Sequence, residues 1–392
     1  MQLKPRSASF DWSPVAFAAA AAYLTFLAAM FVSHYWLRDA DGHIIASDFI
    51  AVWAAGKLAL MGHAPSVYDW QIHHTVENGI VGRGFPGYYG WHYPPLFLLV
   101  AAALALLPYL AAFGAWVTAT FALYGAVIAR IAGSRTAWLW ALAFPASLLD
   151  AWVGQNGFFT AALFGAVLLA MGERPLLAGI CLGILTYKPQ FGVLFPFVLV
   201  AAGEWRALAA AALTAIALGF ASWLAFGSGT WIAFFHSIPV STHMLLATGH
   251  AGWNKLQSVY GVARWLGGGN QVAWGLQIGA AILACAGAIL LWRSSASRAL
   301  KSAALVVAAL LATPYLYIYD FPVLAVAIAF LARDKAFSPY ERVLIAAAAL
   351  AVAGFVLLDA PTGLAATCFV GAIVARRGRV LARRPDVAPQ RA

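Results

Sequence analysis

Charged residues are scarce in this chain, and their scarcity argues against a soluble fold. Only 10% of the 392 residues are Asp, Glu, Lys or Arg, whereas 63% are hydrophobic. An ordinary globular domain carries about 25% charged residues. Apolar runs such as residues 15–32 approach the roughly 20 residues that cross a bilayer as a helix. We therefore predict an all-α polytopic membrane protein, in which the run at 15–32 is a retained helix rather than a signal peptide.

Cysteines and the well-known catalytic motifs are also sparse. The three cysteines, Cys181, Cys285 and Cys368, lie far apart inside apolar runs, which is typical of small core residues rather than of a metal site. The sequence has no phosphate-binding glycine loop, no His-Glu-x-x-His and no Gly-x-Ser-x-Gly. These absences argue against a nucleotide-driven pump and a serine hydrolase.

Acidic residues are outnumbered by basic ones, 14 to 24, and the resulting net charge of +10 comes in large part from one segment. Six arginines follow the last apolar run within residues 376–392. This pattern is typical of a cytoplasmic tail under the positive-inside rule, and anionic lipid binding is the alternative interpretation. We predict one transmembrane domain at 1–375, a basic cytoplasmic tail at 376–392 and no nucleic-acid partner.

The longest polar stretch, residues 38–92, follows the first apolar run. We predict that it forms a first outer loop with short interfacial helices, that 228–255 forms a second one, and that roughly 11 to 13 helices are transmembrane or re-entrant. The number of spans assigned to residues 93–131 conflicts with this topology in one interpretation. If residues 93–131 hold two full spans, Arg130 and Arg135 fall outside. Either that pair includes a half-membrane helix or the positive-inside rule fails locally.

Asp48 precedes a predicted helix over 49–61, which we expect to lie in the membrane interface and to end at Gly62. Because Ser and Asp are favoured at helix N-termini, Ser47 or Asp48 capping this helix is one interpretation. A carboxylate beside an apolar helix is also partly desolvated, which raises its pKa and suits a general base. The two roles are compatible, and both stay open at this point.

Two further motifs place polar side chains at helix boundaries. In GWHYPPLFLL, prolines begin a helix and His92 and Tyr93 stand just before it. In VGQNGFF, Gln155 and Asn156 separate two short apolar runs. In each motif the polar side chains either face a substrate or serve only the turn.

Charged residues inside the apolar part of the chain form a third group. Lys188, in LTYKPQFG, has no acidic neighbour in sequence, so it either extends to the interface or binds an anion. Asp320, in TPYLYIYDFP, stands at a helix boundary, and Lys255 and Arg264 add positive charge that suits a lipid phosphate. The seven-residue spacing of three histidines is a weak metal pattern, and we predict no metal site: His236, His243 and His250.

The order of these motifs resembles glycosyltransferase family 87, of the polytopic GT-C class, which was formerly a domain of unknown function. The resemblance extends from about residue 45 to about residue 335. Near the late proline segment, the family's mannosyltransferase that extends phosphatidylinositol mannosides has histidine where this chain has aspartate, which leaves the sugar and acceptor open. The motifs that carry it are Ser47-Asp48-Phe49, a glycine-rich turn ending in Tyr68-Asp69, Tyr93-Pro94-Pro95, Gly154-Gln155-Asn156, Lys188-Pro189 and Thr313-Pro314 followed by Asp320.

The resemblance implies an inverting transferase that moves a hexose, commonly mannose, from a polyprenyl-phosphate donor to a lipid or glycan acceptor. Asp48 would be the catalytic base, and Lys188 would stabilise the leaving phosphate, with Lys255 or Arg264 as substitutes. We expect no metal or other cofactor, since the donor already carries its phosphate leaving group. The residues expected to bind substrate are His92, Tyr93, Gln155, Asn156, Lys188, Lys255, Arg264 and Asp320.

The expected location follows from the same chemistry. The protein would lie in the inner membrane of a bacterial cell envelope, among membrane lipids, with its site facing the periplasm. A transporter or flippase of a lipid-linked sugar is the alternative, because broken helices and polar residues near one face also suit transport. A non-catalytic membrane scaffold would explain the helices but not the polar residues gathered on one face.

Overall fold

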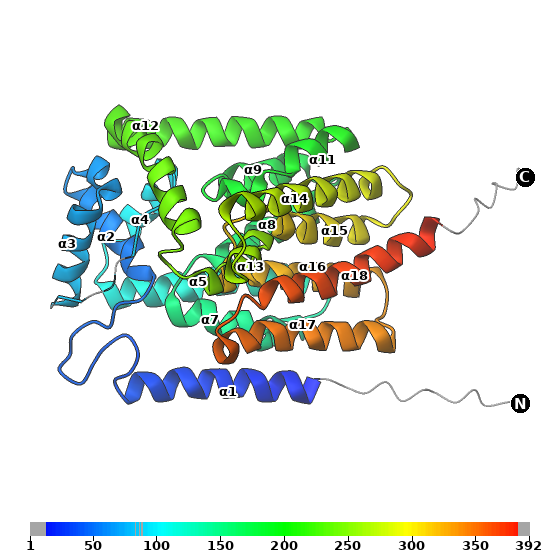
Figure 1. The fold of residues 1–392 in the computed structure, drawn as a ribbon, viewed down its shortest axis with the longest axis horizontal. Helices are drawn as coiled ribbons and strands as arrows, with labels where there is room; N and C mark the ends of the chain where they lie inside the picture. The colour runs from blue at the N-terminus through cyan, green and yellow to red at the C-terminus, as the bar shows by residue number, and fades with distance from the viewer. Residues whose placement is uncertain (1–12, 83, 86, 88, 383–392) are drawn as a thin grey trace, which may run out of the picture.

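The computed structural model describes residues 13–82, 84–85, 87 and 89–382, and every named element within them is a helix (Figure 1). Extended pairing among these residues is limited to isolated bridges, such as the one between Leu256 and Tyr317. The helices are α1 (Ser13–Val32), α2 (Phe49–Leu60), η1 (Ala64–Tyr68), α3 (Trp70–Val81), η2 (Pro95–Phe97), α4 (Leu98–Leu104), α5 (Tyr109–Ala132), α6 (Ala137–Ala143), α7 (Pro145–Val153), α8 (Gly157–Ala170), α9 (Pro175–Leu185), α10 (Pro189–Gly192), α11 (Phe195–Ala202), α12 (Trp205–Thr242), η3 (His243–Ala247), η4 (Trp253–Lys255), α13 (Val259–Trp265), α14 (Asn270–Trp292), α15 (Arg298–Ala312), η5 (Ile318–Asp320), α16 (Pro322–Asp334), α17 (Pro339–Leu358) and α18 (Gly363–Ala382).

Five of the described helices are long and apolar enough to cross a membrane alone. Most of their side chains are not buried inside the protein, which suits helices whose outer faces contact lipid. The predicted all-α polytopic membrane fold is confirmed. The five spans are α1, α5, α12 with η3, α14 and α17.

Several other apolar helices are short, and proline or glycine explains where they break. Pro145 separates α6 from α7, and Pro189 begins α10 directly after Lys188. Gly227 interrupts α12 with φ 77°, a left-handed value that glycine adopts without strain. The predicted second outer loop, 228–255, is therefore largely helical, since α12 continues beyond this kink and η3 follows directly. The predicted count of membrane helices stays a prediction.

The bundle has two distinct ends (Figure 1). Helices α2, α3 and α4 gather at one end, which we call the loop end. The first described residues of α1 and the last of α18 both lie toward the opposite end, which we call the basic end. Arg298, Arg376, Arg377 and Arg379 also lie at the basic end, where α15 begins and α18 finishes.

The conflict over Arg130 and Arg135 is resolved by the length of α4, which has only seven residues. The indole of Trp53 in α2 donates a hydrogen bond to the carbonyl of Leu107 at 3.0 Å, so the start of α5 lies at the loop end. The 24 residues of α5 then extend about 36 Å, at about 1.5 Å per residue. They carry Arg130 to the basic end, as the positive-inside rule requires.

The structure adds detail to two predictions, one about the first outer loop and one about the basic tail. Most residues of helix α2 are buried beneath neighbouring helices of the loop end, and its predicted location in the membrane interface stays a prediction. Part of the predicted tail is helical, since α18 continues to Ala382 and includes three of its arginines. Several basic residues of the predicted topology lie outside the described residues: Lys4 and Arg6 before the first apolar run, Arg83 in the first loop, and Arg383, Arg384 and Arg391 in the tail.

This topology predicts that residues 63 and 134 lie on opposite sides of the membrane. In a variant without native cysteines, His63→Cys and Ser134→Cys, both at exposed positions, should react with a membrane-impermeant maleimide from opposite faces of oriented vesicles. Permeabilised vesicles are the control for reactivity. Labelling of both from the same face would restore the two-span interpretation of residues 93–131.

Candidate active site

Asp48 stands at the N-terminal boundary of α2, but its side chain does not cap the helix. The first turn is closed by the main chain, since the amide of Ile50 donates to the carbonyl of Ser47 at 2.9 Å. The capping interpretation is therefore wrong for the Asp48 side chain. Its carboxylate instead accepts a hydrogen bond from Nε2 of Gln155 at 3.2 Å, across 107 residues of sequence.

Aromatic packing fixes the position of Asp48 within the loop end. Phe49 is fully buried and contacts the rings of Tyr109 and Phe113, with centroid distances of 5.6 and 5.4 Å. Ser47 lies 3.4 Å from the hydroxyl of Tyr109. Because both flanking residues are anchored on α5, Asp48 is held against the bundle while remaining partly accessible to solvent.

The break between α7 and α8 presents Gln155. Gly154 ends α7 with φ 68°, and Asp150 accepts hydrogen bonds from the amides of Gly157 and Phe158 at 3.2 and 2.7 Å. These bonds cap the start of α8, and Nε2 of Gln155 takes no part in this capping. A Cβ atom on Gly157 would lie 1.8 Å from the carbonyl oxygen of Tyr319, which shows how closely this break approaches the segment before Asp320.

The Gln155 amide is oriented by bonds to its other end. Its Oε1 accepts from the hydroxyl of Tyr93 at 3.2 Å and from the amide of Asn156 at 3.3 Å. With Oε1 used as an acceptor, Nε2 is left to donate to Asp48. Tyr93 is itself held by Tyr68, whose hydroxyl donates to the Tyr93 carbonyl at 2.9 Å. The sequence motif containing Tyr93 and the one containing Gln155 are thus in direct contact.

Asn156 is buried beside this group, at 1% exposure. Its side-chain amide lies close to the Tyr93 hydroxyl but makes no hydrogen bond of normal geometry with a described residue. Its main-chain carbonyl accepts from Thr160 at 2.9 Å and from Tyr187 at 3.3 Å. An unsatisfied buried amide is costly, so it is a natural partner for a polar group of a bound molecule.

Lys188 and Asp320 form a buried ion pair, with 2.5 Å between Nζ and Oδ1. They are 5% and 1% exposed, and 132 residues separate them in sequence. Asp320 also accepts a hydrogen bond from the amide of Tyr317 at 3.2 Å. The lysine without an acidic neighbour in sequence therefore has one in space, and Asp320 neutralises its charge. The substrate-binding roles predicted for these two residues stay predictions.

Tyr317 and Tyr319 connect the two carboxylates. Their rings stack at a centroid distance of 5.4 Å, and Lys188 Nζ lies 5.5 Å from the ring of Tyr319. Burial, followed by the negative charges of Asp320 and Asp48, raises the pKa of both tyrosine hydroxyls. Both carboxylates therefore act on the same pair of rings. These tyrosines were not among the site residues predicted from the sequence. The alternation in YLYIY is a signal of an extended segment, but the chain is extended only up to Tyr317, because η5 begins at Ile318.

Lys255 is the exposed cation of this region. Its charge acts on Asp48 and lowers the pKa of that carboxyl, and among the described residues it makes no ion pair. Buried Gln257 fixes the turn that carries it, because Gln257 Nε2 donates to the carbonyls of Asn254 and Lys255 at 2.8 and 3.1 Å. The main chain of Gln257 is in turn tied to the carbonyl of Leu316 at 2.7 Å.

Arg264 and His92 are less directly connected to this centre. The guanidinium of Arg264 donates to the carbonyls of Gly268 and Ala247 at 3.1 and 2.9 Å and lies over the ring of Trp253, so structural contacts occupy it. Exposed His92 lies 3.1 Å from the hydroxyl of Ser241 on the kinked part of α12. The structure therefore groups Asp48, Tyr93, Gln155, Asn156, Lys188, Lys255 and Asp320, with His92 adjacent and Arg264 apart.

The electrostatics of Asp48 suit proton transfer. Burial raises the pKa of its carboxyl above the ordinary aspartate value, while the Gln155 hydrogen bond and the charge of Lys255 offset part of that rise. A carboxylate with a raised pKa is a stronger base than a solvated one.

A second carboxylate near the loop end was missed from the sequence. Glu77 lies in α3 beside His73, with 3.5 Å between Oε1 and the ring nitrogen Nδ1. Burial raises the pKa of Glu77 to about 8 and lowers that of His73 to about 4, so both tend toward their neutral forms at pH 7. Because His73 also contacts the carbonyl of Ala51 at 3.3 Å, the pair serves to fasten α3 to α2.

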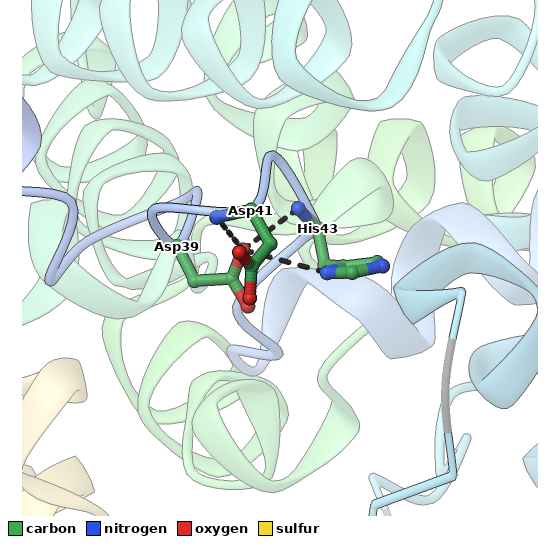
Figure 2. A group of neighbouring side chains, drawn as sticks. All are labelled: Asp39, Asp41 and His43. Carbon is green, nitrogen blue, oxygen red and sulfur yellow. Dashed lines mark hydrogen bonds and ion pairs between the residues drawn. The ribbon is translucent and has the colours of Figure 1, made fainter.

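A turn of the first loop brings together Asp39, Asp41 and His43, whose potential ligand atoms lie within 4.8 Å of one another (Figure 2). Asp39 Oδ1 accepts from the main-chain amides of Asp41 and His43 at 3.1 and 2.8 Å. It also lies 3.6 Å from the His43 ring. These bonds account for the turn as a local structure, so we assign no metal to it.

Comparison with known proteins agrees with the motif order. The family model described as Glycosyltransferase family 87 matches residues 91–314. No curated protein and no solved structure gives a significant match. The matched region includes Tyr93, Gln155, Lys188 and Lys255, whereas Asp48 and Asp320 lie outside it. The hydrogen bond to Gln155 and the ion pair to Lys188 connect these two carboxylates to the matched region.

The buried pair predicts a strong dependence of stability on both partners. Asp320→Asn should leave Lys188 buried without a counter-charge and lower the free energy of unfolding by about 3–5 kcal/mol. The double variant Lys188→Met with Asp320→Leu should regain most of that loss, because two apolar side chains replace the pair. Thermal unfolding in detergent measures both effects. Equal destabilisation by the single and double variants would show that the ion pair is not the relevant interaction.

Proposed function

The chain belongs to glycosyltransferase family 87, and from that premise we propose that it is an inverting, polyprenyl-phosphate-dependent hexosyltransferase. The acceptor is a lipid or glycan, and mannose is the first sugar to test. The proposed reaction takes place at the loop end, where Asp48 acts as the base. The observation that carries this proposal is the arrangement of Asp48, which is partly accessible, has a raised pKa and is aimed by Gln155.

The proposed reaction needs a base that removes the proton of the acceptor hydroxyl, and it produces negative charge on the leaving phosphate. Asp48 takes the proton of the acceptor hydroxyl while the acceptor oxygen forms a bond to the anomeric carbon. The bond from that carbon to the phosphate oxygen breaks, and its electron pair leaves with the polyprenyl phosphate. The transition state resembles an oxocarbenium ion, as in other glycosyl transfers, and a single displacement inverts the anomeric centre. The donor supplies its own leaving group, so the proposal includes no metal or other cofactor.

A cation should stabilise the negative charge that develops on the leaving phosphate. Lys255 suits this role better than the other two candidates. It is exposed and close enough to act on Asp48, whereas Asp320 neutralises Lys188 and main-chain carbonyls occupy Arg264. In this proposal Lys188 has a structural role instead: it fixes the position of Asp320 through their ion pair, and the ring of Tyr319 packs against its ammonium group.

A cavity of about 360 Å³ suits the lipid part of the donor. It lies between the kinked end of α12 and α14, lined mainly by apolar side chains that include Ile238, Leu246 and Trp274. Thr242, which also lines it, accepts a hydrogen bond from Tyr315 at 2.9 Å, and Tyr315 lies two residues before Tyr317. This adjacency supports a donor whose isoprenoid chain lies in the cavity and whose phosphate reaches Lys255.

The proposed location follows from the distribution of arginine and lysine. The positive-inside rule places the basic end in the cytoplasm and the loop end outside. For a bacterial cell, this orientation means the inner membrane, with Asp48 facing the periplasm. A lipid-linked donor suits that side of the membrane, where nucleotide sugars are not supplied.

Transport of a lipid-linked sugar is the rival function. The broken helices would suit it, but a transporter needs no general base, and its acidic residues tend to lie mid-span. Asp48 and Asp320 instead lie at helix boundaries at the loop end. Covalent attachment of the sugar to a new acceptor distinguishes transfer from a change of leaflet.

Replacement of the base should abolish transfer without loss of the fold. Asp48→Asn keeps the shape of the side chain and removes its basicity, so we expect at least about a 100-fold slower formation of product, read by mass spectrometry, with polyprenyl-phosphate mannose as donor. Donor binding and thermal stability should change little. The matched control is Asp41→Asn, an exposed aspartate of the same loop. Near-normal turnover by Asp48→Asn would remove Asp48 as the base.

The pH dependence of transfer tests the role of Gln155. Its amide stabilises the ionised form of Asp48, so Gln155→Leu should raise the Asp48 pKa further. Because the base works only when deprotonated, the acidic limb of the rate profile should move to higher pH. Gln71→Leu, at an exposed position on α3, should leave the limb in place. An unchanged limb in Gln155→Leu would separate Gln155 from the titration of the base.

A further inference from the structure

A second cavity, of about 560 Å³, lies at the basic end, away from the site of transfer. Its size is within the range of about 300–1,000 Å³ that is usual for small-molecule sites. The lining combines two arginines with apolar and aromatic side chains from α17 and α18: Tyr340, Ala372, Ala375, Arg376, Arg379 and Val380.

The two arginines of this cavity differ from the arginine between them. Arg377 is buried and forms ion pairs with Asp334 and Glu341 at 3.1 and 2.9 Å, so its charge is compensated within the protein. Arg376 and Arg379 are exposed, and the ion pairs among the described residues give neither a carboxylate partner. The cavity therefore presents two uncompensated positive charges.

Arg376 is nevertheless held in a defined position. Its guanidinium lies 5.2 Å from the ring centroid of Tyr340, and its Nη1 donates to Ser338 at 3.3 Å. Ser338 is itself fixed in the capping box of α17, because its hydroxyl accepts from the amide of Glu341 and its amide donates to the Glu341 carboxylate. The two guanidinium groups that line one cavity suit an oxyanion such as a phosphate.

The surroundings favour a phosphate that belongs to a lipid. Tyr340, Val343 and Leu350 follow one another at helical spacing along one face of α17, with 55%, 65% and 72% of their surfaces exposed. This apolar face begins at the cavity and continues along a helix long enough to span the membrane. A molecule with a phosphate headgroup and acyl chains matches both the arginines and this face, whereas free phosphate matches the arginines alone.

We propose that this cavity binds the headgroup phosphate of an anionic phospholipid, such as phosphatidylglycerol or cardiolipin, in the leaflet at the basic end. Arg376 and Arg379 contact the phosphate, Tyr340 orients Arg376, and the acyl chains lie along the exposed face of α17. Basic cavities between transmembrane helices on the cytoplasmic side are a known means of recognising such lipids. The site is independent of the transfer reaction and of the sugar donor.

Native mass spectrometry tests this proposal with the full chain and defined lipids. We compare binding of phosphatidylglycerol and phosphatidylcholine to the unmodified protein, to Arg376→Ala with Arg379→Ala, and to a control with Arg293→Ala and Arg333→Ala. The control removes the same charge from exposed arginines at the same end that do not line the cavity. We expect about 30-fold weaker phosphatidylglycerol binding in the cavity variant, from about fivefold for each arginine, and little change in the control.

The possible outcomes separate the proposal from its alternatives. Equal loss in the cavity and control variants would show general attraction between charges and overturn the site. Unchanged binding in the cavity variant would also overturn it. Inorganic phosphate that displaces the lipid at millimolar concentration would assign the cavity to free phosphate instead. Thermal unfolding in neutral lipid confirms that the variants are folded. The single variant Arg379→Glu, which leaves Arg376 in place, should also weaken phosphatidylglycerol binding.

Discussion

The hydrogen bond between Asp48 and Gln155 is the contact on which the proposed site depends. It joins the first loop to the break between α7 and α8, two segments that lie far apart in sequence. The capping of α8 by Asp150 and the hydroxyl of Tyr93 orient the Gln155 amide, so its Nε2 points at the carboxylate. A base held in this way loses little entropy when substrate arrives, which is the advantage of a site preorganised by the fold.

The Lys188–Asp320 pair provides the other fixed point. Burial of two charges is costly, and it is tolerated here because the pair is close and Asp320 also accepts a main-chain amide. The pair keeps the segment with Tyr317 and Tyr319 against the α7–α8 break, where Gly157 permits close contact. The same segment pairs with the residues around Leu256, which position Lys255. The proposed base and the proposed cation are thus placed by one connected set of loops.

The composition and the order of motifs predicted the fold class and the family, but the sequence did not show which distant residues contact one another. Apolar runs predicted the membrane helices, and residue order predicted the family and most candidate site residues. The length of α4 was not predictable, because an apolar run of 93–108 is compatible with a span or a short helix. The partner of Lys188 was also not predictable, because Asp320 lies 132 residues away in sequence. The Asp48 side chain was ambiguous because a helix boundary suits a cap as well as a base, and only the structure excludes the cap, since the carboxylate bonds to Gln155 instead of to α2.

The most direct test of the central claim is a cryo-electron microscopy map of the Asp48→Asn variant with a bound polyprenyl-phosphate sugar. The account predicts density for the anomeric carbon beside residue 48, for the phosphate beside Lys255, and for the isoprenoid chain in the cavity between α12 and α14. The Lys188–Asp320 pair should remain intact beneath the sugar. A donor bound with its phosphate away from residue 48 and Lys255 would contradict the account.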